Sequence, residues 1–475
     1  MNLRKSPLTR LLTAAAGLAA AAGLVAGCSN AISPGSSATN IAAETASVPV
    51  LITDSPSDQL VAFTLTLNSI TLTDSANKTA SILPSATTIE ICHLNGIQAP
   101  LVTASIPQDT YTSATITFSN PQITYINSSG AAVSVTPTLT TTSFQFNFPT
   151  PFTVSNASTS LLIDLLAGPS VNISGTTVAV TPQFNLKPVP PASAAPPSGQ
   201  NGTGMQQMAT VVSVSGASVT LEPGSGPNFT VTTNSATLLQ GPGFTSLSAL
   251  TAGELVQVDF IVEAGGVYLA TRIQIPPPPP AGQPPVNLLS GPVTSVSSGS
   301  FKMALMQGLG PAIPVSATAV SLFTVTTNSS TVFAITPQFQ SLSGLPFTPT
   351  FTSANLVAGQ SVGVVASSVS GNTATASDVY LIPQTLGGTV TAISTVGGYT
   401  AYTLSLNSGS AFTSLSGAST VTVYTSGATA PPPGATAPPA IAVNSQVRFN
   451  GLVFNLGGGS FAMVAGCSPD GAPGI

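Results

Sequence analysis

The segment AFTLTLNSITL, residues 62–72, places an apolar side chain at nearly every second position. Side chains of a strand point alternately to its two faces, so Phe63, Leu65 and Leu67 lie on one face and Thr64 and Thr66 on the other. The same alternation recurs at residues 113–118 and 142–148. No long stretch has the three- and four-residue spacing of an amphipathic helix. The patterning therefore predicts an all-β protein.

The chain is poor in charged groups. Its 475 residues include 8 Lys or Arg, 13 Asp or Glu and one His, so 4% of them are charged, against about 25% in an average soluble protein. Scattered cations cannot neutralise a run of phosphates, and this excludes a nucleic-acid partner. The shortage of acids and histidine also leaves little material for a catalytic constellation. We therefore expect a protein that is not an enzyme and needs no cofactor.

The N-terminus has the pattern of an export signal. Residues 1–10 include three basic residues, and residues 11–25 form an apolar run of signal-peptide length. The run ends in VAGC, residues 25–28, which resembles the lipobox of bacterial lipoproteins. The resemblance implies a signal peptide over 1–27 and a lipid on Cys28, which would anchor the protein to a membrane.

The residues after the cysteine bear on localisation. An aspartate directly after the lipidated cysteine would resemble an inner-membrane retention signal, and this chain has Ser29 at that position instead. By that analogy we expect an outer-membrane lipoprotein that faces the periplasm or the cell surface. The alternative is an ordinary signal peptide cleaved nearby, which leaves Cys28 as an unmodified thiol. Residues 28–47 are small and polar and predict a flexible tether.

Composition shifts divide the remaining chain. Proline-rich stretches at 190–205 and 276–287 predict linkers, because polyproline segments act as semi-rigid spacers. The first linker follows a predicted β-sandwich over 48–189. The later predicted segments are three β-barrel repeats and a tail, at 206–275, 288–384, 385–466 and 467–475.

A seven-residue identity indicates internal repeats. FTVTTNS occurs at 229–235 and again at 323–329, and Leu-x-Ala-Gly follows each copy, at 250–253 and 356–359. A third copy begins near residue 388 and lacks both motifs in clean form. Each unit offers five or six strands, which suits a small barrel because closure removes exposed sheet edges.

These motifs carry two family resemblances. Residues 48–189 are similar to the domain-of-unknown-function 4382 family through LITDSPSD at 51–58, DTYT at 109–112 and LLID at 161–164. The three repeats resemble the domain-of-unknown-function 5666 family, whose members are small β-barrel units often found in series. Neither family has an established activity, so the resemblances imply an architecture rather than a chemistry.

Asp54 and Asp58 form the candidate metal site. They lie four residues apart in the turn-like segment TDSPSD. Paired carboxylates in a loop supply oxygen ligands of the kind that calcium prefers. The alternative is that both aspartates cap turns by accepting hydrogen bonds from backbone N–H groups.

The other candidate groups are cysteines and acids. Cys92 and Cys467 form a candidate disulfide, because an oxidising envelope would allow them to pair. His93 follows Cys92, and alternation along a strand sends the two side chains to opposite faces, which argues against a nucleophile and base pair. Asp259 and Glu263 are predicted to be solvated.

These patterns favour a lipid-anchored cell-envelope protein that serves as a non-catalytic binding, adhesion or scaffolding module with an envelope protein as partner. A second hypothesis is capture of a polysaccharide or another extracellular polymer. A third is a hydrolase built on Asp54, Asp58 and Asp164, because glycosidases place two carboxylates around a cleft.

Overall fold

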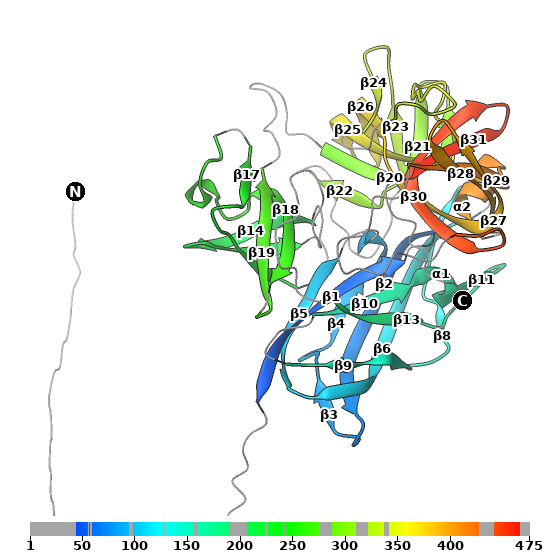
Figure 1. The fold of residues 1–475 in the computed structure, drawn as a ribbon. Coiled ribbons are helices and arrows are strands. Elements are labelled where there is room, and N and C mark those ends of the chain that lie inside the picture. The colour runs from blue at the N-terminus through cyan, green and yellow to red at the C-terminus, as the bar shows by residue number, and fades with distance from the viewer. Residues whose placement is uncertain are drawn as a thin grey trace, which may run out of the picture. The chain divides into compact units, whose positions relative to one another are not determined.

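The structure is a computed structural model in which most described residues lie in strands and few lie in helices, which confirms the predicted all-β class (Figure 1). No helix among the described residues has the length and hydropathy to span a membrane. The predicted signal peptide, Cys28, the 190–205 linker and the tail lie outside the described residues. The description covers residues 44–465, except 56, 58, 95–97, 128, 156–159, 190–206, 224–226, 242, 264, 276–286, 310–321, 337–341, 408 and 427–440.

The N-terminal domain is a sandwich of two sheets. One sheet has the order β13-β10-β1-β5, and the other has the order β3-β2-β6-β7, with β4 on β2 and β9 on β6. Apolar side chains from both sheets form one core. The bounds are β1 Thr45–Ser55, β2 Leu60–Asp74, β3 Thr79–Ser81, β4 Thr87–Glu90, β5 Ala99–Pro107, β6 Thr110–Ile126, β7 Ala132–Val135, β9 Ser143–Thr153, β10 Ser160–Leu166 and β13 Phe184–Val189.

A smaller sheet and two short helices complete this domain. The sheet has the order β11-β12-β8. Helix α1 connects β10 to β11, and the 3-10 helix η1 follows β4. The bounds are η1 Cys92–Leu94, β8 Thr138–Leu139, α1 Ala167–Ser170, β11 Val171–Ser174 and β12 Thr177–Val180.

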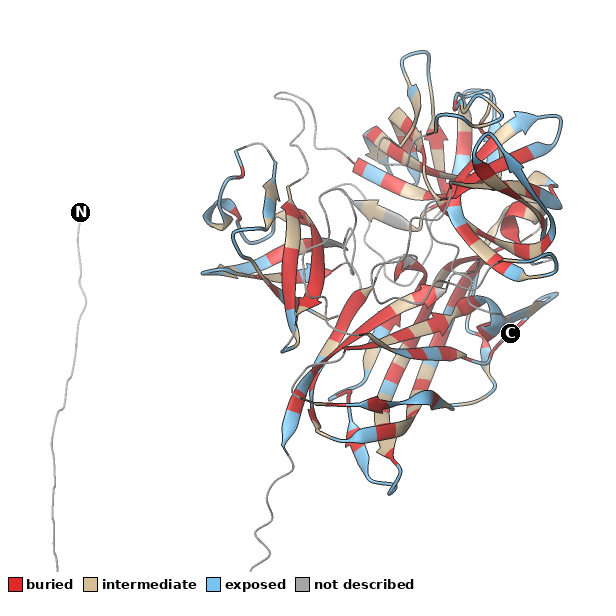
Figure 2. Cartoon of the chain, viewed as in Figure 1, coloured by how far each residue is buried: buried red, intermediate tan, exposed pale blue. Residues whose placement is uncertain are grey.

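Strand β2 has the alternation expected from its sequence. Phe63, Leu65 and Leu67 are buried, whereas Thr66 is half-buried and Asn68 is exposed. Figure 2 shows buried and more exposed positions alternating along many strands. The inner face of each sheet therefore supplies the core, and the outer face carries the hydroxyl and amide groups.

Strand β1 begins earlier than the predicted domain boundary at residue 48. It starts at Thr45, and Ala46 and Val48 are both buried. Ala46 pairs with Ile106 of β5. Ala46 continues the apolar alternation of β1, but its side chain is small and its neighbours are polar. The composition of residues 28–47 therefore predicted a tether where the strand already begins.

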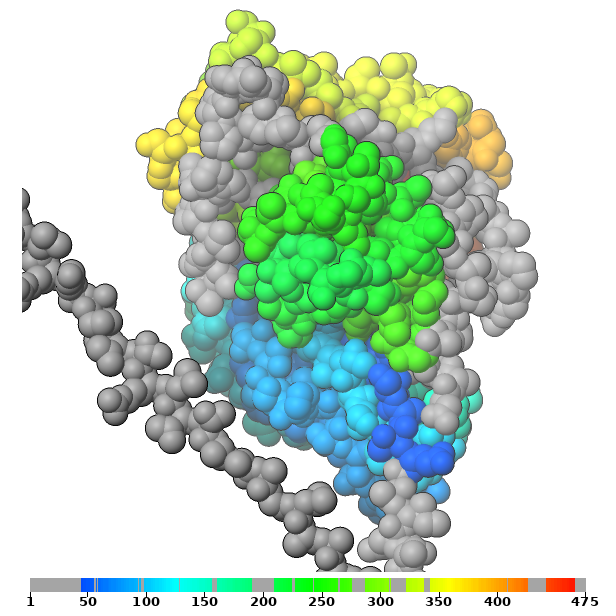
Figure 3. Space-filling view, turned by 90° about the vertical axis from the view of Figure 1, so that its left-hand side faces the viewer, coloured from blue at the N-terminus to red at the C-terminus, as the bar shows by residue number. Residues whose placement is uncertain are grey.

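Residues 207–274 form a closed barrel, here called barrel 1. Its strands pair in the order β16-β15-β14-β18-β19, and β16 also pairs in parallel with β19, which closes the sheet. Figure 3 shows one face of this barrel in green. The bounds are β14 Gln207–Ser215, β15 Ser218–Pro223, β16 Phe229–Thr232, β17 Leu238–Gln240, η2 Leu247–Ala249, β18 Leu255–Glu263 and β19 Val267–Gln274.

Two further closed barrels follow, barrel 2 over 287–381 and barrel 3 over 384–465. Both repeat the pairing of barrel 1, and in each the third and fifth strands of the closed sheet are parallel, as β23–β26 and β29–β31. Barrel 2 contains β20 Asn287–Ser297, β21 Ser300–Ala304, β22 Gln307–Leu309, β23 Leu322–Thr326, β24 Val332–Ile335, β25 Ser361–Ser370 and β26 Thr373–Leu381. Barrel 3 contains β27 Gln384–Val396, β28 Tyr399–Leu406, α2 Ala411–Ser416, β29 Thr420–Ser426, β30 Gln446–Gly457 and β31 Ser460–Ala465.

The Leu-x-Ala-Gly motif forms the turn before the fourth barrel strand. Gly253 and Gly359 have φ angles of +87° and +96°, a left-handed region that side chains disfavour. Their N–H groups donate to the carbonyls of the first strand at Val211 and Val293, at 2.8 and 2.7 Å. The motif therefore encodes a backbone conformation.

Barrel 3 has the same turn without the motif. Asn444 has a φ of +73°, and its N–H donates to the carbonyl of Val390 on β27 at 2.8 Å. Asparagine tolerates left-handed backbone better than most residues. Barrel 3 thus has the same turn conformation with an asparagine at the place of the glycine.

Barrels 2 and 3 are joined by a buried glutamine. Gln360 has no exposed surface. Its Oε1 accepts the N–H of Val357 at 2.9 Å, and its Nε2 donates to the carbonyl of Val453 in barrel 3 at 2.8 Å. Leu452 and Phe454 of barrel 3 belong to the apolar core of barrel 2. The two barrels therefore share packing.

We predict that Gln360→Ala lowers the free energy of unfolding by about 2–4 kcal/mol, because the partly buried N–H of Val357 and the buried carbonyl of Val453 each lose a partner. The measurement is urea denaturation of the full chain. Gln446→Ala is the matched control: its Nε2 bonds Thr389 on an exposed surface, so we expect less than about 0.5 kcal/mol. Equal midpoints for the two variants would contradict the prediction.

Candidate functional sites

Asp54 lies near the end of β1 and points into the sandwich core. It pairs in register with Leu165 of the parallel strand β10, and it is only 5% exposed. Neither carboxylate oxygen has a hydrogen-bond partner among the described residues. Strand β1 extends through Asp54, so this residue does not lie in the turn that both sequence-based readings assumed.

The structure describes only Asp54 of the predicted pair of Asp54 and Asp58. Asp58 lies outside the described residues, so calcium binding by the pair stays a prediction. Within the part of the chain that the structure describes, no three His, Cys, Asp or Glu side chains are grouped to hold a metal ion.

Other acids surround Asp54. Glu90 is buried, and its Oε1 accepts the backbone N–H groups of Phe63 at 2.8 Å and Cys92 at 3.3 Å. Asp164 pairs with Thr53 in the β1–β10 register, so regular alternation places it on the opposite face of the sheet from Asp54. No observation tests the hydrolase hypothesis on Asp54, Asp58 and Asp164, which stays a prediction.

Burial and these acids keep Asp54 protonated over a wider pH range than usual. Burial raises the pKa of the Asp54 carboxyl well above its ordinary value, and the charges of Asp164 and Glu90 raise it further. The Arg448 guanidinium and the Ala167 backbone N–H lower this pKa without reversing the rise.

Cys92 is buried on the 3-10 helix η1, and it forms no disulfide with any residue that the structure describes. The predicted strand at Cys92 and His93 is wrong: β4 ends at Glu90, and the N–H of Leu94 turns back to the carbonyl of Ile91 at 2.9 Å. The side chain of His93 is outside the description. Cys467 also lies outside the described residues, so its pairing with Cys92 stays a prediction.

Asp259 is paired with a cation rather than solvated, which corrects the sequence-based prediction. It is 5% exposed. The Nε and Nη2 atoms of Arg272 lie 2.7 and 2.6 Å from its Oδ2. The two residues are direct partners in the β18–β19 register beside a bulge, and this cross-strand relation was invisible in the sequence.

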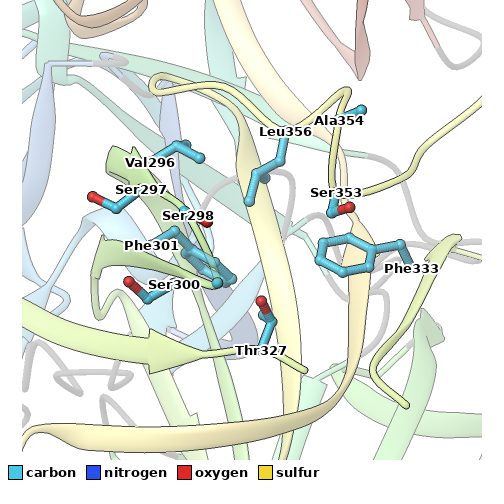
Figure 4. Close-up of a pocket in the computed structure, with 11 residues that line it drawn as sticks. Val296, Ser297, Ser298, Ser300, Phe301, Thr327, Phe333, Ser353, Ala354 and Leu356 are labelled. Atoms are coloured by element: carbon cyan, nitrogen blue, oxygen red, sulfur yellow. The ribbon is translucent and has the colours of Figure 1, made fainter. Parts of the chain in front are cut away.

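Barrel 2 carries an open cavity of about 260 Å³ (Figure 4). Val296 and Phe301, from the β20–β21 hairpin, line one side, and Phe333 of β24 lines the other, with Leu356 from the loop before β25. The lining also includes the side-chain hydroxyls of Ser297, Ser298, Ser300, Thr327 and Ser353. None of the lining residues is ionisable. The cavity can therefore hold a neutral ligand through apolar contacts and hydroxyl hydrogen bonds.

The sequence offered a weak signal for this cavity. Thr327 belongs to the repeated FTVTTNS segment. The remaining lining residues come from strands and loops that are distant in the sequence, and only the tertiary fold brings them together.

The fold defines a class of modular all-β protein, a sandwich followed by closed five-stranded barrels. Residues 45–188 match the family described as Domain of unknown function (DUF4382), and residues 209–274 match the family described as Domain of unknown function (DUF5666). The matches confirm the resemblances for the sandwich and for barrel 1.

Other comparisons add little. No curated protein matches the chain. A solved structure described as "drosophila Unr CSD456" aligns at 11% identity over 55% of this chain and 95% of its own, with a TM-score of 0.13. A likeness at that score carries no argument about fold or function.

We predict that Asp54→Asn stabilises the protein near pH 7. The raised pKa means that the folded chain keeps a proton that the unfolded chain releases above its value of 3.8. The free energy of unfolding therefore falls as pH rises from 3.8 toward the folded-state pKa, by up to about 1.4 kcal/mol per pH unit. Asparagine does not titrate, so its advantage should shrink toward pH 4 in urea denaturation series.

The exposed Asp109 provides the control, because Asp109→Asn should leave this pH dependence unchanged. A loss of stability in Asp54→Asn at pH 7, together with stabilisation of the wild-type chain alone by added Ca²⁺, would contradict the prediction. That result would instead support the calcium site.

We also predict that iodoacetamide fails to modify Cys92 in the native chain and modifies it in urea without reductant. Cys92 is 3% exposed. Burial raises the pKa of its thiol well above the usual value, and Glu90 and Asp54 raise it further, so the reactive thiolate is scarce. Peptide mass mapping measures the modification. Protection in urea that reductant removes would overturn this prediction and establish a disulfide.

Proposed function

We propose that the chain is a lipid-anchored protein of the bacterial cell envelope that acts as a non-catalytic binding, adhesion or scaffolding module. The observation that carries the binding role is the open cavity of barrel 2, whose lining has no ionisable side chain. Such a surface holds a ligand but offers no group for proton transfer at neutral pH. The anchor is supported by the lipobox-like residues ahead of Cys28.

The placement of the buried acids agrees with this proposal. Glu90 bonds backbone N–H groups inside the sandwich, and Asp259 is paired with Arg272. Asp54 faces the core, away from Asp164 by register. These carboxyl groups have structural surroundings, which favours a binding protein over a hydrolase.

We further infer that barrels 2 and 3 are diverged copies of the module in barrel 1. Three features support this: the same strand pairing, the same first-strand carbonyl receiving a left-handed turn, and FTVTTNS in the first two copies. Asn444 in place of glycine explains why the third copy resembles the family less clearly. The chain then presents one module type repeatedly, which suits a scaffold or an adhesive surface.

We predict that Cys28→Ser abolishes lipidation and releases the protein from the membrane fraction, because a serine hydroxyl does not form the thioether. The measurement is incorporation of radiolabelled palmitate in growing cells, followed by fractionation. Cys92→Ser is the control and should retain both label and membrane association. Label persisting in Cys28→Ser, or a wild-type chain found unlabelled in the soluble fraction, would overturn the proposed anchor.

Orientation and membrane are tested separately. Sucrose-gradient separation of the two membranes assigns the fraction, and protease treatment of intact cells cleaves the modules only if they face outward. Cleavage supports adhesion, whereas protection until the outer membrane is broken supports a periplasmic scaffold.

A further inference from the structure

We propose that the cavity of barrel 2 binds a single neutral sugar ring, as one residue of an uncharged polysaccharide. The inference deepens the proposed binding function and rests on it. It assigns the ligand class from the chemistry of the walls and places the decisive contact on Phe333.

The lining combines two kinds of surface. Val296 and the half-buried Phe333 expose apolar surface, with the buried Phe301 beneath them. Figure 4 shows the Thr327 hydroxyl between the rings of Phe301 and Phe333. A sugar ring has apolar C–H faces and a rim of hydroxyls, so it can use both surfaces at once. Serine and threonine hydroxyls donate and accept hydrogen bonds, as sugar hydroxyls do.

The absence of ionisable lining residues selects against charged ligands. An anionic or cationic group entering the cavity would lose water without gaining an opposite charge. The cavity volume of about 260 Å³ lies just below the roughly 300–1,000 Å³ of typical sites for drug-sized ligands. That size suits one ring, and exposed rim residues such as Ser297 and Ser353 leave room for a chain to continue outward.

Phe333 is positioned for stacking. It is half-buried on β24, which pairs in parallel with β26. Its ring lies 5.9 Å from that of the buried Phe351, at an interplanar angle of 58°. This contact fixes the ring from the protein side, so a ligand would meet an aromatic surface that is already oriented.

The strand of barrel 1 that is equivalent to β24 is β17, which has no aromatic residue at the position of Phe333. Leu238 pairs with Arg272 as Val332 pairs with Asp378, and in both barrels a bulge follows at that level. Leu239 therefore occupies the place of Phe333. Barrel 1 folds with leucine at this position and barrel 2 with phenylalanine. The substitution Phe333→Leu therefore removes the aromatic ring but keeps an apolar side chain at the position.

The experiment uses the full chain and a panel of methyl glycosides of glucose, galactose, mannose and N-acetylglucosamine, with glucuronic acid as the charged comparison. Saturation-transfer NMR detects binding, and titration gives Kd. We expect saturable binding of at least one neutral glycoside and none of the acid. Phe333→Leu should weaken binding about fivefold or more, in line with the loss of an aromatic contact.

The matched control is Val332→Leu, which also installs a barrel 1 residue. Val332 is 53% exposed and neighbours Phe333 on the strand, so its side chain points to the other face. We expect its Kd to stay within twofold of wild type. Ser353→Ala, at an exposed rim position, should weaken binding without affecting the fold even if Phe333→Leu unfolds barrel 2.

Several outcomes would overturn the inference: no neutral glycoside binds, the acid binds equally well, or the folded Phe333→Leu chain binds as wild type does. Palmitate labelling of the same Phe333→Leu chain keeps this test separate from the proposed function. A chain that remains lipid-anchored but shows no sugar binding in any form would disprove the sugar site and leave the envelope role standing.

Discussion

Each barrel depends on the pairing of its third and fifth strands, which lie side by side in parallel. Without that pair, the five strands would form an open sheet with two exposed edges, and open edges are prone to join other chains. Closure also turns the alternating side chains of every strand into an inner and an outer set. The cavity of barrel 2 exists only because this closure brings the β20–β21 hairpin near β24.

A second constraint is how the few polar interior groups are satisfied. With 4% charged residues, the protein uses its buried polar side chains largely as structural links. Gln360 ties barrel 2 to barrel 3, and Asp259 binds Arg272 across two strands. Asp54 is the departure, since its carboxyl lies in the core with no hydrogen-bond partner among the described residues. Its raised pKa follows from that position, because an ionised carboxylate would lack solvation there.

The repeats illustrate how far a motif reaches. FTVTTNS and Leu-x-Ala-Gly located equivalent strands and turns in barrels 1 and 2 directly from the sequence. Barrel 3 lacks both motifs in clean form, yet Asn444 adopts the same left-handed turn as the glycines of the other two barrels. Sequence identity records residue types, whereas the turn requires only a residue that tolerates a positive φ, so a structural equivalence can outlast the motif.

The sequence by itself determined the all-β class, the order of the modules and the neutral character of their surfaces, because alternation and composition are local properties of the chain. The tertiary structure decided the surroundings of Asp54, the pairing of Asp259 with Arg272, the join at Gln360 and the cavity beside Phe333. These depend on register and closure between segments distant in sequence. A shift of one residue in register reverses the face of every side chain in a strand, and no local pattern fixes that choice.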